Sequence, residues 1–262
     1  MSESSNSDRT VTEGAVAPGV TEGAAASSEV ETALAATGAQ SCVPLAVFDF
    51  DGTSISGNSP VLLVLYLMRR KMLSKSVLAR IAVWAIAYKF RLPQNESWVR
   101  GLVFSAFEGC SRIEVDAFLT EFYDTEIAHL FRKQADGVMQ ARSQEGCKVI
   151  VVSATFEPIV VRAMENHPFD MQISTRMRTT ESDTYTREVE GLPVEGAEKV
   201  AALTRFADEH YGQDGWRLAY AYGDHHSDEE LLSAAEHAFA VTPDKPLSRL
   251  ARRNGWEILS WN

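Results

Sequence analysis

The sequence of 262 residues predicts an α/β fold: a Rossmann-like parallel sheet with an inserted all-helical segment and a small β-hairpin. Short apolar runs that stop at a polar or glycine-containing turn are typical of strands buried on both faces. Four such runs alternate with segments of helical periodicity, which indicates parallel strands with helices on both faces. The runs are residues 45–48, 148–153, 217–222 and 237–241.

The first 41 residues are predicted to form a disordered acidic tail. They are rich in Ser, Glu, Thr, Ala and Gly, so they bury too little apolar surface to offset the entropy of ordering. The segment lacks the basic start and apolar middle of a secretory signal peptide, and we therefore expect a cytoplasmic protein. Three cysteines without a Cys-x-x-Cys spacing fit a reducing compartment. The net charge of −11 argues against a nucleic-acid partner.

An all-helical insert is predicted over residues 57–140. Within it, residues 61–90 are strongly apolar with helical periodicity, which predicts a buried helical hairpin. Its longest uncharged stretch, 81–88, is far shorter than the about 20 residues that span a bilayer, although contact with a membrane surface is an alternative. Further helices are expected over 96–109, 112–123 and 125–145.

The remaining elements complete an α/β core made of residues 42–56 and 141–262. Residues 171–190 alternate apolar and polar side chains, which predicts a β-hairpin. Helical spacing covers 157–166, 197–211 and 229–236.

Two carboxylates, Asp49 and Asp51, follow the first predicted strand and precede Gly52 and Thr53. Residues two apart on a strand point the same way, and ligands of open α/β sheets bind at the carboxyl ends of strands. Two carboxylates placed together repel each other unless a cation or proton lies between them. Mg²⁺, usually accompanied by a phosphate, is the simplest solution.

Four short signals lie at the ends of predicted strands or at a helix start. They are Asp49-x-Asp51-Gly-Thr, Ser153-Ala154-Thr, Lys199 within Gly-Ala-Glu-Lys, and Gly223-Asp224-x-x-x-Asp228. Each has an ordinary structural explanation when taken alone, as a helix cap, a solvated lysine or an acidic first turn. Together they supply a nucleophile, an acid/base, cation ligands and groups for phosphate oxygens, which favours phosphoryl transfer.

With these motifs, the chain resembles the haloacid dehalogenase-like (HAD) hydrolase superfamily, closest to subfamily IB, the phosphoserine phosphatase-like branch with a helical cap. The resemblance covers about residues 45–261 and includes the ending Val241-Thr-Pro-Asp-Lys-Pro-Leu followed by Gly255-Trp256. It implies a Mg²⁺-dependent phosphatase that hydrolyses a small-molecule phosphate monoester through an aspartyl-phosphate.

The resemblance also implies roles for single residues. Asp49 would be the nucleophile, and Asp51 the general acid and then the general base. The phosphoryl group would be held by Ser153 and Lys199, and we expect Gly52, Thr53 and Ala154 beside it. The magnesium ligands would be Asp49, Asp224 and Asp51 through its backbone carbonyl, with Asp228 supporting them.

Two departures from the family pattern limit these expectations. His225 and His226 stand where small residues are more usual, and we expect at least one of them to face solvent or to support the metal ligands indirectly. Asn58 stands about where phosphoserine phosphatases carry an acidic residue, which argues against phosphoserine as the substrate. Transfer to an alcohol acceptor is an alternative, as is a non-catalytic protein that docks on a membrane or partner through residues 61–90.

Overall fold

The computed structural model describes residues 42–74, 76–77, 79–80 and 103–261. The predicted tail therefore lies outside the described residues, as do most of the second half of the apolar segment 61–90 and the start of the helix expected at 96–109.

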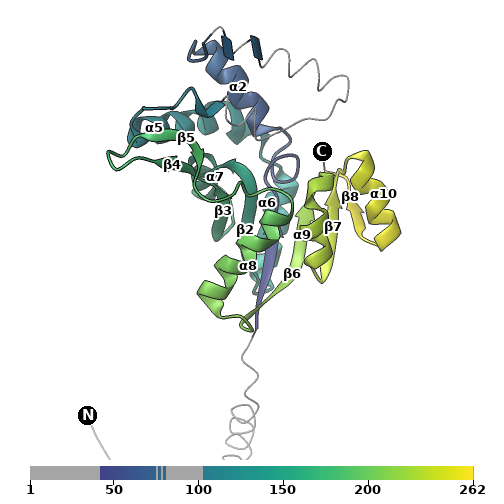
Figure 1. The fold of residues 1–262 in the computed structure, drawn as a ribbon. Helices are drawn as coiled ribbons and strands as arrows, with labels where there is room; N and C mark the ends of the chain where they lie inside the picture. The colour runs from purple at the N-terminus through teal and green to yellow at the C-terminus, as the bar shows by residue number, and fades with distance from the viewer. Residues whose placement is uncertain (1–41, 75, 78, 81–102, 262) are drawn as a thin grey trace, which may run out of the picture. The chain divides into compact units, whose positions relative to one another are not determined.

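Six parallel strands form one sheet in the order β3-β2-β1-β6-β7-β8 (Figure 1). The strands are β1 (Val43–Phe48), β2 (Lys148–Phe156), β3 (Met171–Thr175), β6 (Trp216–Gly223), β7 (His237–Val241) and β8 (Glu257–Leu259). β1 lies between β2 and β6, and Phe48 near its end pairs with Val151 and Tyr222. The segment after β1 is therefore placed beside the carboxyl ends of two other strands.

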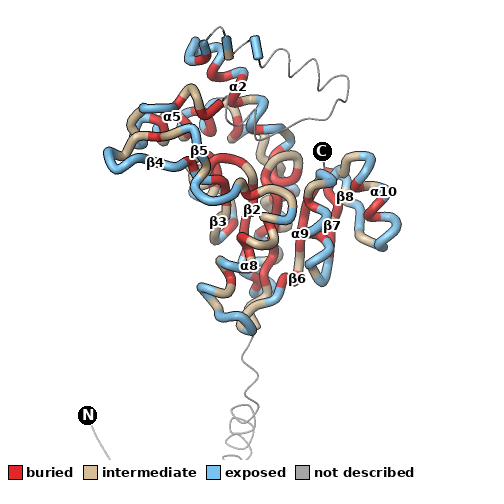
Figure 2. The backbone as a smooth tube through the Cα atoms, viewed as in Figure 1, coloured by how far each residue is buried: buried red, intermediate tan, exposed pale blue. Residues whose placement is uncertain are grey.

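Apolar side chains on both faces of the sheet produce two hydrophobic clusters. Along β1, Ala46 and Phe48 belong to one cluster and Leu45 and Val47 to the other. Helices α6 (Lys133–Gln144) and α7 (Glu157–Met164) pack into the first cluster. The second cluster is packed by α8 (Ala197–Tyr211), α9 (Glu229–Ala234) and α10 (Lys245–Asn254). Figure 2 shows the resulting line of buried residues through the sheet, and the predicted α/β architecture is confirmed.

The hairpin predicted over 171–190 is only partly correct. Its first part, Met171–Thr175, is β3 and pairs in parallel with β2 at the edge of the main sheet. The antiparallel pair is formed by β4 (Met177–Thr179) and β5 (Tyr185–Val189). An edge strand is only partly covered, so it shows the same alternating pattern as a hairpin strand.

The segment predicted as an all-helical insert begins with α2 (Ser59–Arg69), which buries Leu63 and Leu67 but exposes Val61, Leu65 and Met68. The part of the predicted buried hairpin that the structure describes is thus buried on one side only. No helix within the described residues is long and apolar enough to cross a membrane.

The single helix predicted over 125–145 is correct for its second part and wrong for its first. After α5 (Arg112–Phe122), the chain forms a π-helical turn over Tyr123–Ile127 and a 3₁₀ turn over Ala128–Leu130, and then α6. At this break, Ser56 N–H donates to the carbonyl of Leu130 and Arg132 N–H to that of Ser54, both at 2.9 Å. Because these bonds link residues about 75 positions apart, local periodicity does not reveal them.

Candidate active site

Asp49 is the first residue after β1, and its carboxylate is almost completely buried. Its N–H donates to the carbonyl of Tyr222 on β6, which fixes it to the neighbouring strand. The hydroxyl of Ser54 donates to the backbone carbonyl of Asp49 at 2.6 Å and closes the loop that follows. The chain can turn here because Gly52 adopts a φ of +75°, a conformation that favours glycine.

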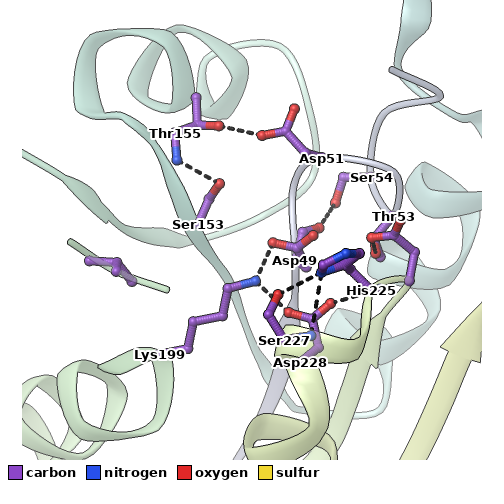
Figure 3. A network of polar contacts seen from close by, with 12 residues as sticks. Asp49, Asp51, Thr53, Ser54, Ser153, Thr155, Lys199, His225, Ser227 and Asp228 are labelled. Atoms are coloured by element: carbon purple, nitrogen blue, oxygen red, sulfur yellow. Dashed lines mark hydrogen bonds and ion pairs between the residues drawn. The ribbon is translucent and has the colours of Figure 1, made fainter. Parts of the chain in front are cut away.

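Lys199 brings two carboxylates together (Figure 3). Its ammonium group lies 2.6 Å from Oδ1 of Asp49 and 2.6 Å from Oδ1 of Asp228. All three side chains are at least nine-tenths buried. Lys199 stands in the first turn of α8, whose N-cap, Gly196, has a φ of +53°. The solvated-lysine explanation is therefore excluded, because this lysine is a buried partner of two aspartates.

Asp224 completes a cluster of three carboxylates. One oxygen each from Asp49, Asp224 and Asp228 lies within 4.8 Å of the others. Thr53 donates its hydroxyl to Oδ1 of Asp224 at 3.2 Å. The missing side chain of Gly52 makes room for Asp224, since a Cβ there would lie 2.0 Å from Oδ2 of Asp224.

The charges of this cluster do not balance, because three carboxylates face one ammonium group. Burial raises the pKa of Asp49 well above its usual value, and Lys199 opposes that shift. Burial and the charge of Asp228 raise the pKa of Asp224 to about 7. Burial alone would lower the pKa of Lys199, but the charges of Asp228 and Asp49 outweigh it and keep the amine protonated. A donor set of carboxylate oxygens with excess negative charge fits a hard divalent cation.

Asp51 has partners of a different kind. Its Oδ1 accepts the backbone N–H of Ser59 at 2.5 Å, and its Oδ2 accepts the hydroxyls of Ser59 at 3.0 Å and Thr155 at 2.5 Å. Burial raises the pKa of Asp51, although these hydrogen bonds and the charge of Lys199 lower it in part. Figure 3 shows the carboxylate of Asp51 turned towards Thr155, whereas Asp49 faces Lys199.

The Ser153-Ala154-Thr155 motif forms the third side of the site. Ser153 is buried near the end of β2, and its hydroxyl accepts the N–H of Thr155 at 3.0 Å. Ala154 has no polar side-chain atom, so only its backbone is available to a phosphate. The four predicted signals thus converge at the carboxyl ends of β1, β2 and β6 and at the start of α8. The phosphate-binding and catalytic roles of their residues stay predictions.

Several residues that contact the site were not among the predicted ones. Ser59 and Thr155 hold Asp51, and Arg132 donates to the carbonyls of Gly52 at 3.3 Å and Trp261 at 2.7 Å. Ser59 precedes a proline, a common start of a helix, and Thr155 lies inside a motif already identified. No local signal marks Arg132, because its partners are 80 and 129 residues away.

The residues that depart from the family pattern, His225, His226 and Asn58, all contact residues outside the carboxylate cluster. Both histidine side chains are about half exposed and approach Asp244 instead of the carboxylate cluster. The backbone of His225 contacts Asp228 of the cluster: its N–H lies 3.2 Å from Oδ2 of Asp228, and its carbonyl accepts the N–H of Asp228 at 2.9 Å. The side chain of Asn58 caps α2 by accepting the N–H of Val61 at 3.0 Å.

Comparisons with known proteins agree with this geometry. The profile of the haloacid dehalogenase-like hydrolase family matches residues 46–233. A histidinol-phosphatase from Neisseria meningitidis is 24% identical over 237 residues, 83% of this chain and 98% of that protein. Phosphoserine phosphatase SerB1 from Mycobacterium tuberculosis is 27% identical over 238 residues, 86% of this chain and 75% of that protein.

Solved structures share the fold. A protein of unknown function from Bordetella pertussis superposes with a TM-score of 0.73 at 22% identity, over 83% of this chain and 98% of that one. A phosphoserine phosphatase in a phospho-aspartyl intermediate analogue state gives a TM-score of 0.56 at 19% identity, over 84% and 93%. The resemblance in the motifs is therefore confirmed, and the chain belongs to the haloacid dehalogenase-like hydrolase family.

Proposed function

We propose that this protein is a Mg²⁺-dependent phosphatase that hydrolyses a phosphate monoester of a small molecule through an aspartyl-phosphate on Asp49. The observation that carries the proposal is the buried cluster in which Lys199 lies between Asp49 and Asp228, with Asp224 beside them. The relatives named histidinol-phosphatase and phosphoserine phosphatase support a small phosphate ester as the substrate.

In this proposal, Asp49 attacks phosphorus. Burial raises the pKa of Asp49, and positive charge around it lowers that pKa again. With enough positive charge, Asp49 is ionised at neutral pH and needs no base to deprotonate it. Lys199 supplies one positive charge at 2.6 Å, and a Mg²⁺ ion held by Asp49, Asp224 and the backbone carbonyl of Asp51 would supply the rest. That ion would reduce the repulsion between Asp49 and the phosphate dianion. Asp228 contributes by holding Lys199.

In this proposal, Asp51 transfers the protons. A carboxyl group with a raised pKa can protonate the leaving alcohol oxygen, and the resulting carboxylate can then take a proton from the attacking water. The hydroxyls of Ser59 and Thr155 can donate to the carboxylate form or accept from the carboxyl form. Asp51 therefore keeps hydrogen-bond partners in both protonation states.

The phosphoryl oxygens would be bound by the groups that border Asp49. The hydroxyl of Ser153, the ammonium of Lys199 and backbone N–H groups of the loops at Gly52 and Ala154 are the donors we assign to them. Hydrogen bonds from groups fixed by a buried framework need no reorganisation during the reaction.

The test is release of inorganic phosphate from a panel of phosphomonoesters by the purified full-length chain. Activity is expected with Mg²⁺, loss of activity with a chelator, and recovery when Mg²⁺ is restored. Asp49→Asn should remove activity while the protein stays folded. Full activity in Asp49→Asn, or no release from any ester of the panel, would contradict the proposal.

Phosphoryl transfer to an alcohol acceptor uses the same intermediate and is separated from hydrolysis by its product. With glycerol or another alcohol present, hydrolysis yields inorganic phosphate alone, whereas transfer yields a new phosphate ester. We assign water as the acceptor because the relatives are named histidinol-phosphatase and phosphoserine phosphatase.

A further inference from the structure

Three side chains of the kinds that bind metals lie together outside the carboxylate cluster: His225, His226 and Asp244. Nε2 of His225 lies 3.6 Å from Oδ2 of Asp244, and Nδ1 of His226 lies 3.1 Å from the same oxygen. One donor atom from each of the three residues lies within 4.8 Å of the other two. Different nitrogens of two successive histidines thus approach one carboxylate oxygen.

These separations match those of atoms that share a metal ion. Two ligands bound at about 2.1 Å are about 3.0 Å apart when they subtend a right angle, and about 3.4 Å apart at the tetrahedral angle. The observed 3.1 Å and 3.6 Å lie at or near those values. The rings are also close, with centroids 4.1 Å apart and planes inclined by 50°.

The candidate ligand atoms have other hydrogen-bond partners. Oδ2 of Asp244 accepts the backbone N–H of His226 at 3.4 Å, and Nδ1 of His225 accepts that of Ser227 at 3.4 Å. A carboxylate oxygen has lone pairs for more than one partner, and Nε2 of His225 is the ring nitrogen left for an ion. Oδ1 of Asp244 accepts the N–H of Leu247 at 2.7 Å and caps α10, so Oδ2 is the oxygen that faces the histidines. Nδ1 of His225 lies 3.0 Å from the hydroxyl of Ser227, a contact that orients the ring and directs Nε2 towards Asp244. The side chains of the two histidines are 46% and 58% exposed, which gives an ion access and leaves room for water ligands.

We propose that His225, His226 and Asp244 bind a divalent transition-metal ion of the zinc type, at a site separate from the carboxylate cluster. Imidazole nitrogens suit zinc, nickel and copper, whereas a cluster of carboxylate oxygens suits magnesium. The backbone N–H of Asp244 donates to the carbonyl of Asp224 at 2.9 Å. The ion therefore joins the loop of residues 224–228 to the start of α10 and stabilises a loop that carries two carboxylates of the neighbouring cluster.

The experiment is a calorimetric titration of the full-length chain with Zn²⁺ in the presence of saturating Mg²⁺, which occupies the carboxylate cluster. The variants are the double change His225→Gln/His226→Gln and the single change Asp244→Asn. Asparagine caps a helix as well as aspartate does, so Asp244→Asn removes the ligand charge but keeps the start of α10. His210→Gln, an exposed histidine on α8, is the matched control.

We expect the double variant to bind Zn²⁺ at least about 100-fold more weakly than the parent, and Asp244→Asn at least about tenfold more weakly. His210→Gln should bind as the parent does. Electron paramagnetic resonance with Cu²⁺ as the probe should show nitrogen hyperfine coupling in the parent and in His210→Gln. That coupling should be lost in the double variant.

Equal Zn²⁺ affinity in the parent and Asp244→Asn, together with unchanged nitrogen coupling in the double variant, would overturn the proposal. So would a parent that binds no Zn²⁺ once Mg²⁺ is saturating. Circular dichroism of the metal-free variants establishes that they are folded. If the double variant fails this check, Asp244→Asn alone decides.

Discussion

Asp49 and Asp51 are separated by one residue, yet the two sides of the site that they face differ in chemistry. On the side of Asp49, the partners are charged: the ammonium of Lys199, and Asp224 and Asp228 close by. On the side of Asp51, the partners are one backbone N–H and the two hydroxyls of Ser59 and Thr155. Asp49 is buried and Asp51 is partly buried, and the clearest difference between them lies in their partners.

The end of one strand thus places two carboxylates in two different chemical environments. A fixed positive charge favours the ionised form of its neighbour, which is the form that a nucleophile needs. Hydroxyl groups can be donors or acceptors, so they satisfy both a carboxylate and a carboxyl group. The two environments support the division of labour that we propose, with Asp49 accepting the phosphoryl group and Asp51 transferring protons.

The largest effect is expected from removing the charge on the Asp49 side. Lys199→Met leaves Asp49 and Asp228 buried without their partner, and we expect unfolding free energy to fall by about 3–5 kcal/mol and kcat by about 10²–10³-fold. Chemical denaturation and phosphate release measure the two effects. Lys133→Met, at an exposed lysine on α6, should change neither.

Mg²⁺ provides a second check on the same variant. If the loss of stability arises from unbalanced carboxylates, added Mg²⁺ should restore part of it by binding the folded state. A variant as stable as the parent without Mg²⁺ would show that Lys199 does not hold the cluster together.

The second-largest effect is expected from filling the space beside Gly52 that the carboxylate of Asp224 occupies. In Gly52→Ala, the added Cβ would meet Oδ2 of Asp224, so the carboxylate must move and the Mg²⁺ concentration for half-maximal activity should rise at least about tenfold. Gly109→Ala is a close control, since Gly109 has the same φ of +75° and no atom of the described residues lies within 4 Å of the added Cβ.

Both glycine variants should lose about 1–2 kcal/mol of stability from the backbone conformation. The Mg²⁺ requirement should change in Gly52→Ala alone. An equal shift in both variants would mean that contact with Asp224 is not the cause.

A smaller effect is expected on the Asp51 side. Thr155→Val removes one of the two hydroxyl groups that donate a hydrogen bond to Asp51, and the hydroxyl of Ser59 remains. We therefore expect kcat to fall about tenfold on an alkyl phosphate. An aryl phosphate such as p-nitrophenyl phosphate has a leaving group that needs no proton, so its first step should be slowed less. Thr180→Val, at an exposed threonine, is the control. If Thr155→Val lost equal activity on both substrates, Thr155 would not act through proton transfer by Asp51.

The sequence predicted the parts of this site that follow from local patterns. Apolar runs located β1, β2, β6 and β7, and the residues at the ends of the first three strands met as expected because the strands are parallel. The helix start at Lys199 was also correctly placed. To predict those features, one needs only the periodicity of strands and helices and the rule that ligands bind at the carboxyl ends of parallel strands.

Long-range pairings could not be predicted in the same way. The break between α5 and α6 depends on hydrogen bonds from the loop after β1, and Arg132 joins Gly52 to Trp261 across most of the chain. The parallel pairing of β3 also escaped prediction, because an alternating pattern does not show which partner a strand takes. The approach of His225 and His226 to Asp244 was not predicted either, because Asp244 lies 19 and 18 residues further along the chain.

The division between Asp49 and Asp51 is tested most directly by a rapid-quench experiment on Asp51→Asn with p-nitrophenyl phosphate and Mg²⁺. Without its general base, this variant should release about one equivalent of p-nitrophenolate per protein in a burst and then stall as a phospho-enzyme. Borohydride reduction of the trapped acyl-phosphate, followed by peptide mass spectrometry, should place homoserine at position 49. Asp49→Asn should show no burst. A burst in Asp49→Asn, or homoserine at another aspartate, would contradict the account.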